Sequence, residues 1–248
     1  MVVLGDSLSF HGPEGPVPLA DPRLYPNVLG VELDRLTGRP WAVEVWGRAG
    51  WGVRELWLAL QKDVHLQQQL LIPADAVVLG IGSADQLSVA VPRWVVMALP
   101  YLRPTGLRRA LRRRIDHVHP ALTRLTGGRM RYTPPSVIRH AWSKSVDAIR
   151  LFAGEDVPLV AVLPAAHRTT YYGGMTTHHV GTHRLVAELA AAKDVAAVDL
   201  AALTRDRLDE LNVDGAHWSW AIHADVGTAM ARALAAQLHP APGARTPA

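Results

Sequence analysis

The feature that most constrains the fold of this chain is a regular alternation of short apolar segments with amphipathic ones. Short, mainly apolar runs predict buried strands; they lie at 2–4, 41–46, 76–79, 159–163 and 195–200. Helical spacing of apolar residues predicts helices between and after them, at 25–36, 53–60, 183–192 and 224–238. Strands separated by helices indicate a parallel sheet with right-handed crossovers. We therefore expect an α/β fold with three layers, in which helices cover both faces of a central parallel sheet.

The chain departs from this alternation between its third and fourth predicted strands. Roughly seventy residues lie there, far more than an ordinary crossover needs, and much of the stretch has helical spacing. Within 106–119, one helical face is apolar and the rest is basic: the apolar set is Leu107, Leu111, Ile115 and Val118, and the basic set is Arg108, Arg109, Arg112, Arg113 and Arg114. We expect one domain over 1–238 with a helical insertion at about 93–157. A flexible tail rich in Pro, Gly and Ala is expected at 239–248.

Composition and charge exclude or disfavour several classes of site and partner. The chain has no cysteine, which excludes disulfides, zinc–thiolate sites and cysteine nucleophiles. The net charge of +4 comes mostly from arginine, which codon bias explains, so we expect no nucleic-acid partner. No apolar run is long enough to cross a bilayer, and the N-terminus lacks the pattern of a signal peptide. We expect a cytoplasmic protein without an integral membrane segment.

Ser7 is the first candidate for chemistry, because it follows the first predicted strand where the chain turns. Ligands of open parallel sheets bind beyond the carboxyl ends of the strands. A serine there presents its hydroxyl to a substrate and its backbone N–H to a developing oxyanion. The hydroxyl becomes a strong nucleophile only when a base takes its proton. Gly5-Asp6-Ser7 is also compatible with an ordinary turn.

The segment Asp214-Gly215-Ala216-His217 supplies the partners of such a serine. It follows the last predicted strand and precedes the last helix. A spacing of three residues in a turn lets Asp214 reach Nδ1 of His217, which leaves Nε2 free to face Ser7. The alternative is an Asx turn that begins the last helix with His217 merely exposed. The combination with Ser7 favours a catalytic triad.

These segments resemble the conserved blocks of the SGNH (GDSL) hydrolase superfamily. Gly5-Asp6-Ser7-Leu8 is similar to its first block and 214–217 to its last, while Gly50 matches the glycine after the second strand. The resemblance implies a flavodoxin-like fold, a triad of Ser7, Asp214 and His217, and an oxyanion hole formed by the N–H groups of Ser7 and Gly50. The third block departs from the pattern, because Ala84 stands where the family has an asparagine that donates to the oxyanion.

A narrower resemblance is to the mycobacterial diglucosylglycerate octanoyltransferase family. It rests on 6–13, 21–23, 26–27, 47–51, Arg103-Pro104 with the arginine-rich helix, and 214–218. The resemblance implies transfer of a medium-chain acyl group from acyl-CoA to a sugar hydroxyl of a glucosylglycerate. The expected partners are thus a small-molecule acyl donor and a sugar or alcohol acceptor. We expect no permanently bound cofactor.

Five further side chains are candidates for substrate binding. Arg108 and Arg112 suit the phosphates of coenzyme A or a carboxylate, because the guanidinium group binds planar anions through two hydrogen bonds. Trp51 and Trp218 each follow a proposed site residue and could line an acyl or sugar pocket, and Tyr171 lies in a loop after a strand. The alternatives are a solvated arginine face, core tryptophans and an ordinary loop.

The remaining candidates concern metal binding and the reaction type. His178, His179 and His183 are clustered, but no glutamate completes a zinc-protease pattern, so we expect no metal site. Acyl transfer and ester hydrolysis share their first half-reaction and both remain open. A non-catalytic carbohydrate-binding relic is favoured only by Ala84.

Overall fold

The computed structural model describes residues 1–92, 95 and 98–238. Five parallel strands form its central sheet in the order β4-β1-β5-β6-β7. Their bounds are Val2–Gly5 (β1), Glu44–Gly47 (β4), Val77–Gly80 (β5), Leu159–Leu163 (β6) and Ala196–Asp199 (β7). In chain order this is the 2-1-3-4-5 arrangement of flavodoxin-like folds. The predicted α/β fold with a parallel sheet is confirmed, whereas the expected tail at 239–248 lies outside the described residues.

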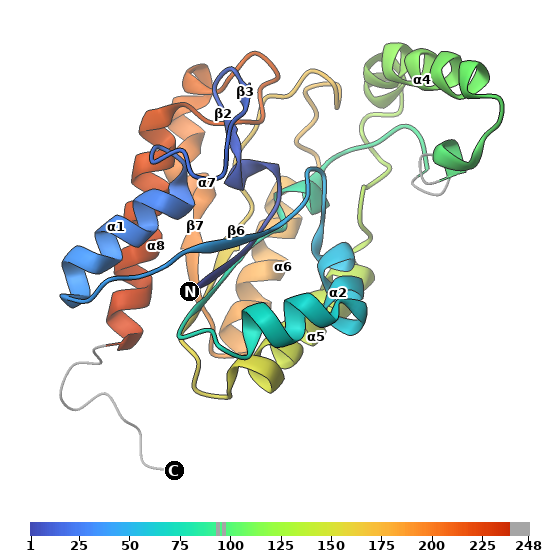
Figure 1. Ribbon diagram of the computed structural model, residues 1–248. Helices are drawn as coiled ribbons and strands as arrows, with labels where there is room; N and C mark the ends of the chain where they lie inside the picture. Colours follow the sequence, from blue (N-terminus) through green and yellow to red (C-terminus); the bar gives the residue numbers. More distant parts are fainter. Residues whose placement is uncertain (93–94, 96–97, 239–248) are drawn as a thin grey trace.

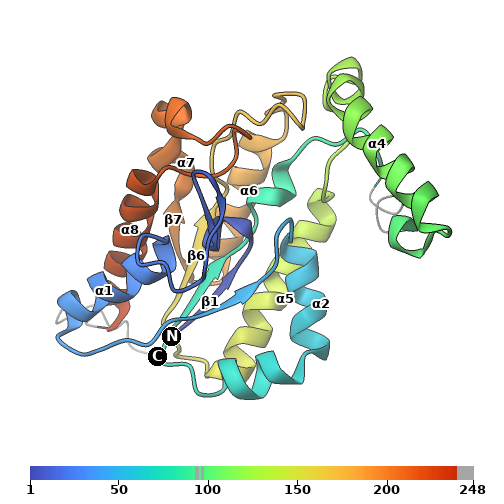
Figure 2. The ribbon, with the colours of Figure 1, turned by 45° about the horizontal axis from the view of Figure 1, so that its top comes forward.

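Helices cover both faces of the sheet, as Figures 1 and 2 show. One face carries α1 (Tyr25–Thr37) and α8 (Trp220–Leu238), which pack against each other. The other carries α2 (Val53–Lys62), α5 (Pro135–Ala153) and α6 (His179–Ala192). Successive strand residues point to opposite faces of a sheet. The strands therefore contribute side chains to two hydrophobic cores, one on each face. In β1, Val3 joins the core with α1 and α8, and Leu4 joins the core with α2, α5 and α6.

Several short elements lie between these strands and helices. They are the antiparallel pair β2 (His11–Gly12) and β3 (Gly15–Pro16), the helical turns η1 (Ser7–Ser9), η2 (Leu66–Leu71), η3 (Ser83–Gln86), η4 (Leu99–Tyr101) and η5 (Arg205–Glu210), and α7 (Leu200–Thr204). One predicted strand begins later than expected. The backbone N–H of Trp41 donates to Asp34 Oδ1 (2.7 Å), so this residue completes the turn after α1 and β4 begins only at Glu44.

The predicted insertion contains two helices with different surroundings. Helix α5 packs on α2 through a buried apolar face that includes Trp142, Val146 and Ile149, so it belongs to the layered fold. Helix α4 (Thr105–Leu125) stands away from the sheet in both views (Figures 1 and 2). The expected limits of about 93–157 therefore include a helix of the sheet layers, and α4 is the part that projects.

One buried histidine connects α4 to the rest of the molecule. His119 Nε2 accepts a hydrogen bond from the N–H of Ala90 (3.3 Å), and its Nδ1 donates to the carbonyl of Tyr171 (2.9 Å). Its ring also stacks on that of Tyr171, with centroids 4.7 Å apart. Helix α4 is thus attached to the loop that follows β6. Within the described residues, no helix is both long and apolar enough to span a membrane.

Candidate active site

Ser7 lies where the first strand ends, at the point where the strand order of the sheet reverses. The chain leaves β1 at Gly5, and Ser7 begins the turn η1. Asp6 caps this turn, because its Oδ1 accepts the N–H of Leu8 (3.0 Å). Ligands of doubly wound sheets bind at such a reversal. The serine hydroxyl therefore stands at the position that the sequence predicts for a nucleophile.

Asp214, His217 and Ser7 form a continuous hydrogen-bonded chain. The hydroxyl of Ser7 donates to His217 Nε2 across 2.9 Å, and His217 Nδ1–H donates to Asp214 Oδ2 across 2.6 Å. The same carboxylate also accepts the backbone N–H groups of Ala216 (2.7 Å) and His217 (3.2 Å) through Oδ1. This is the arrangement in which a histidine removes the proton of a serine while a carboxylate fixes its tautomer.

The electrostatics of Asp214 suit this role. Partial burial alone would raise its pKa, but the hydrogen bonds from His217, Ala216 and Asn212 outweigh burial and lower the pKa to about 2. The carboxylate is therefore ionised at every pH at which the imidazole can act as a base. An ionised partner on Nδ1–H stabilises the imidazolium that forms when Nε2 takes a proton.

Asp6 differs from Asp214 although both are carboxylates beside the serine. It is 3% exposed, and burial is the main reason that its pKa rises to about 7, with the negative charge of Asp85 adding to the effect. Asp6 supports the turn η1 through its hydrogen bond to Leu8.

A pocket of about 290 Å³ opens beside Ser7. Its lining is mainly apolar; it is formed by Asp6, Ser7, Leu8, His11, Ala49, Gly50, Ser83, Ala84, Gln86, Leu87, Ala165, Ala166, His167, Tyr172, Ala216 and His217. We call it the reaction pocket. It combines a serine hydroxyl that is hydrogen-bonded to a histidine with apolar walls, which suit an acyl group.

The reaction pocket also contains both predicted oxyanion donors. Within the described residues, neither the N–H of Ser7 nor that of Gly50 makes a hydrogen bond. Gly50 has a φ of +71°, and a Cβ there would meet no other atom, so the left-handed backbone and not lack of space favours glycine. Its carbonyl accepts the hydroxyl of Tyr132 (2.7 Å), which fixes the loop. The assignment of an oxyanion hole stays a prediction.

Ala84 lines the reaction pocket at the position where the superfamily has its asparagine. It is 8% exposed and lies in the turn η3 after β5. The neighbouring Asp85 is buried and supports the loops, because its carboxylate accepts the N–H of Val53 (2.9 Å) and the hydroxyl of Thr133 (2.6 Å).

The two candidate tryptophans lie outside the reaction pocket. Trp218 is 1% exposed and packs in the core against Tyr25 and His223, so the expectation that it lines a substrate pocket is wrong. Trp51 is half-buried and lines a separate groove of about 980 Å³, with its ring edge against Trp46. This tryptophan groove meets the reaction pocket at Ala49 and Gly50, which line both, so a role of Trp51 toward a long substrate stays a prediction.

The other three candidates line one further pocket together. Arg108, Arg112 and Tyr171 border a cavity of about 460 Å³ on α4, which we call the arginine pocket. The hydroxyl of Tyr171 donates to Asp116 (2.9 Å) on the same helix. None of the three lines the reaction pocket, where the next residue, Tyr172, stands instead.

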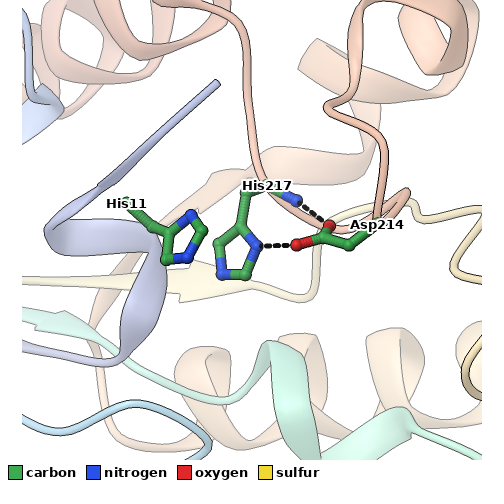
Figure 3. Close-up of side chains that lie close together, drawn as sticks. All are labelled: His11, Asp214 and His217. Atoms are coloured by element: carbon green, nitrogen blue, oxygen red, sulfur yellow. Dashed lines mark hydrogen bonds and ion pairs between the residues drawn. The ribbon is translucent and has the colours of Figure 1, made fainter. Parts of the chain in front are cut away.

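His11 has no assigned role in the sequence analysis, yet it belongs to the site. Its ring lies next to that of His217 (Figure 3), and the two rings are stacked with their centroids 3.7 Å apart. Ring nitrogens of both histidines and a carboxylate oxygen of Asp214 lie within 4.8 Å of one another. The atoms of His217 are already engaged by Asp214 and Ser7. Two of the three clustered histidines have protein partners as well, since His179 is bonded to Gln86 and His183 to Asp199 (3.0 Å). Within the described residues, Nε2 of His178 has no hydrogen-bond partner.

His167 is the second residue that sequence reasoning missed. It is 7% exposed, and neither of its ring nitrogens has a hydrogen-bond partner in the described part of the chain. Burial lowers its pKa to about 4, helped by the charge of His179. Its only sequence signal is its position shortly after a predicted strand.

The chain resembles two proteins of known name over nearly its whole length. No family model matches the chain. The chain is 33% identical to the diglucosylglycerate octanoyltransferase of Mycolicibacterium hassiacum over 95% of its length and 94% of that protein. It is 32% identical to the enzyme of the same name from Mycobacterium tuberculosis, over 95% of this chain and 92% of the relative.

A solved structure agrees in fold. The lipase/acylhydrolase from Enterococcus faecalis superposes with a TM-score of 0.63 at 16% identity, over 96% of this chain and 97% of that one. This likeness and the sheet order confirm the predicted SGNH-type fold. From its sequence identity and coverage, the chain is an acyltransferase or esterase that belongs to the diglucosylglycerate octanoyltransferase family.

Proposed function

We propose that this protein transfers a medium-chain acyl group from acyl-CoA to a sugar hydroxyl of a glucosylglycerate-like acceptor, with Ser7 as the nucleophile. The observation that carries the proposal is the hydrogen-bonded chain from Asp214 through His217 to Ser7 at the wall of a mainly apolar pocket. The names of the relatives supply the octanoyl group and the diglucosylglycerate acceptor, and the acyl-CoA donor comes from the resemblance.

The first half-reaction loads the enzyme. Ser7 Oγ attacks the thioester carbonyl while His217 Nε2 takes the hydroxyl proton, and Asp214 stabilises the imidazolium. The oxyanion faces the N–H groups of Ser7 and Gly50. When the carbon–sulfur bond breaks, His217 gives its proton to the leaving thiolate. Free CoA and an octanoyl ester on Ser7 result.

The second half-reaction repeats these steps with the acceptor. Its hydroxyl oxygen attacks the ester carbonyl, His217 takes the hydroxyl proton, and the bond between Ser7 Oγ and the acyl carbon breaks. The proton returns from His217 to Ser7. Acylated acceptor is released and the enzyme is regenerated.

Hydrolysis of an acyl ester is the second candidate function. The side chain of Asp214 is 43% exposed, so water reaches the triad. Water would then take the place of the acceptor hydroxyl in the second half-reaction. The first half-reaction, acylation of Ser7, would be unchanged.

The test is incubation of the purified protein with octanoyl-CoA, with and without glucosylglycerate, followed by mass spectrometry of protein and products. We expect an octanoyl adduct on Ser7 and an octanoylated acceptor. Ser7→Ala should remove the adduct and lower turnover at least about 10³-fold. Ser136→Ala, at an exposed position in α5, is the matched control. Free octanoate as the only product would favour hydrolysis. Turnover by Ser7→Ala close to that of the parent would contradict the serine mechanism.

A further inference from the structure

A further pocket adjoins the reaction pocket. Its volume is about 420 Å³, and it is lined by Ala166, His167, Thr176, His179, Val180, His183, Arg184, Arg205 and Leu208. We call it the histidine pocket. Ala166 and His167 line both it and the reaction pocket, so these two residues form the shared wall. A molecule in the histidine pocket can therefore contact the wall of the cavity that holds Ser7.

His167 has hydrogen-bonding capacity that the protein does not use. It is more than nine-tenths buried, and both ring nitrogens are without a partner in the described residues. A buried polar group that lacks a partner destabilises the folded protein, and a ligand that supplies the partner removes this penalty. Because its pKa is lowered by burial, the ring is neutral at physiological pH and offers one donor and one acceptor. A sugar hydroxyl, which also both donates and accepts, matches this ring.

Two arginines also line the histidine pocket, whose surface is otherwise mainly apolar. Arg205 has no carboxylate partner within the described chain, and its Nε lies 3.5 Å from the carbonyl of Ala201. Arg184 is loosely paired with Glu188 at 3.8 Å, and both side chains are largely exposed. His183 is already bonded to Asp199. Two guanidinium groups that line one pocket suit a carboxylate.

We propose that the histidine pocket is the acceptor subsite: His167 binds a hydroxyl of a polyhydroxylated acceptor, and Arg184 with Arg205 bind its carboxylate. This rests on the proposed function for the reaction but predicts binding that can be measured without turnover. In this proposal the bound acceptor presents a further hydroxyl to the acyl-serine at the boundary that Ala166 and His167 form between the two pockets. The carboxylate of a sugar acid thus lies in this pocket and not in the arginine pocket of α4.

The first experiment measures binding by calorimetry in the Ser7→Ala background, with glucosylglycerate as the charged probe and methyl glucoside as the uncharged one. Arg205→Gln should weaken the charged probe about 10-fold or more, because a hydrogen bond to a charged group is lost, and should leave the uncharged probe unaffected. Arg113→Gln, at an exposed position outside every pocket described above, is the control. Equal binding of glucosylglycerate by Arg205→Gln would overturn the proposal. So would a loss with Arg108→Gln but not with Arg205→Gln.

The second experiment tests His167 in the Ser7-containing protein. His167→Phe keeps an aromatic ring of similar size without hydrogen-bonding atoms, and His167→Gln retains a donor and an acceptor. We expect the acceptor KM to rise at least about 5-fold for the Phe variant and to recover in part for Gln. The single-turnover rate of Ser7 acylation by octanoyl-CoA should stay near that of the parent in His167→Phe. A fall in this rate of about 5-fold or more would contradict the proposal, because it would place His167 at the oxyanion. Acceptor binding that depends on Arg205, without any acylation of Ser7, would refute the proposed function and leave the subsite standing.

Discussion

The imidazole ring of His11 lies stacked on that of His217, with centroids 3.7 Å apart and planes inclined by 19° (Figure 3). His11 is itself held in place, because its carbonyl accepts a hydrogen bond from Nε2 of the buried His223 (3.1 Å). Asp214 fixes one edge of the His217 imidazole, and His11 covers one face. Together they restrict the ring to the orientation that points Nε2 at Ser7.

The stack predicts a moderate catalytic role for His11. Aromatic pairs contribute about 0.5–1.5 kcal/mol, so we expect His11→Ala to lower kcat about 2- to 12-fold. His11→Phe should recover most of this loss, because it keeps a flat ring over His217. The measurement is the rate of CoA release from octanoyl-CoA at saturating acceptor. A loss as large for Phe as for Ala would show that His11 acts through its nitrogen atoms.

Asp214 should matter far more than a surface aspartate. Replacement of the triad aspartate by asparagine lowers kcat about 10⁴-fold in serine proteases, because asparagine holds the wrong histidine tautomer. We expect at least about a 10³-fold loss of kcat for Asp214→Asn. Asp209→Asn is the matched control, since Asp209 is exposed in the neighbouring turn η5. Comparable activity of the two variants would remove the carboxylate from the mechanism.

The opposite pKa shifts of the two carboxylates predict opposite effects of pH on stability. The pKa of Asp214 is lowered to about 2, so its contribution to stability is present above about pH 4 and is lost as pH falls toward 2. The pKa of Asp6 is raised to about 7, so the folded state holds its proton more tightly than the unfolded state. Its ionisation therefore destabilises the fold increasingly as pH rises from about 4 through 7.

Asp6→Asn tests the second effect. Asparagine keeps an oxygen that accepts the N–H of Leu8 but cannot ionise. We expect the free energy of unfolding of Asp6→Asn, relative to the parent, to increase between pH 5 and pH 8. Urea denaturation at the two pH values measures this difference, and other titrating groups cancel in the comparison. A difference that does not change with pH would contradict a raised pKa.

Residues that directly follow a strand or precede a helix were the most predictable part of the site. Ser7 follows β1, and Asp214 with His217 precede α8. The periodicity of apolar residues in β1 and α8 indicates where each element ends or begins. The candidate site residues lie in the turns beside them. The sheet was predictable for the same reason. The limits of the insertion were not, because the apolar face of α5 has the same helical spacing whether it packs on the sheet layers or elsewhere.

Neighbours of site residues were the least predictable, because adjacent side chains point in different directions. Trp218 directly follows His217 yet lies in the core. Tyr171 packs on His119 of α4, and only Tyr172 lines the reaction pocket. The choice between such neighbours depends on contacts with distant segments. His167 shows the same limit, since its burial and its missing partners arise only from packing.

Ala84 offers a test of how the site divides its activity between transfer and hydrolysis. The residue lines the reaction pocket in η3, where the superfamily's asparagine would donate to the oxyanion, and alanine cannot donate. Loss of one oxyanion donor costs about 10²–10³ in kcat, or about 2.7–4 kcal/mol. The N–H groups of Ser7 and Gly50 remain as two donors. Such a site can still react with an activated thioester while it reacts poorly with plain alkyl esters.

We therefore expect the parent to use octanoyl-CoA and activated aryl esters but to show negligible hydrolysis of alkyl esters. Ala84→Asn should increase ester hydrolysis, because the new amide can donate to the oxyanion, and should thereby divert acyl groups from the acceptor to water. Ala49→Asn adds the same side chain at another lining position of the reaction pocket and is the control. Initial rates on an aryl ester, an alkyl ester and octanoyl-CoA compare the three proteins. Vigorous hydrolysis of alkyl esters by the parent would show that another group already replaces the missing oxyanion donor. The alanine at position 84 would then no longer be a reason to favour acyl transfer over hydrolysis.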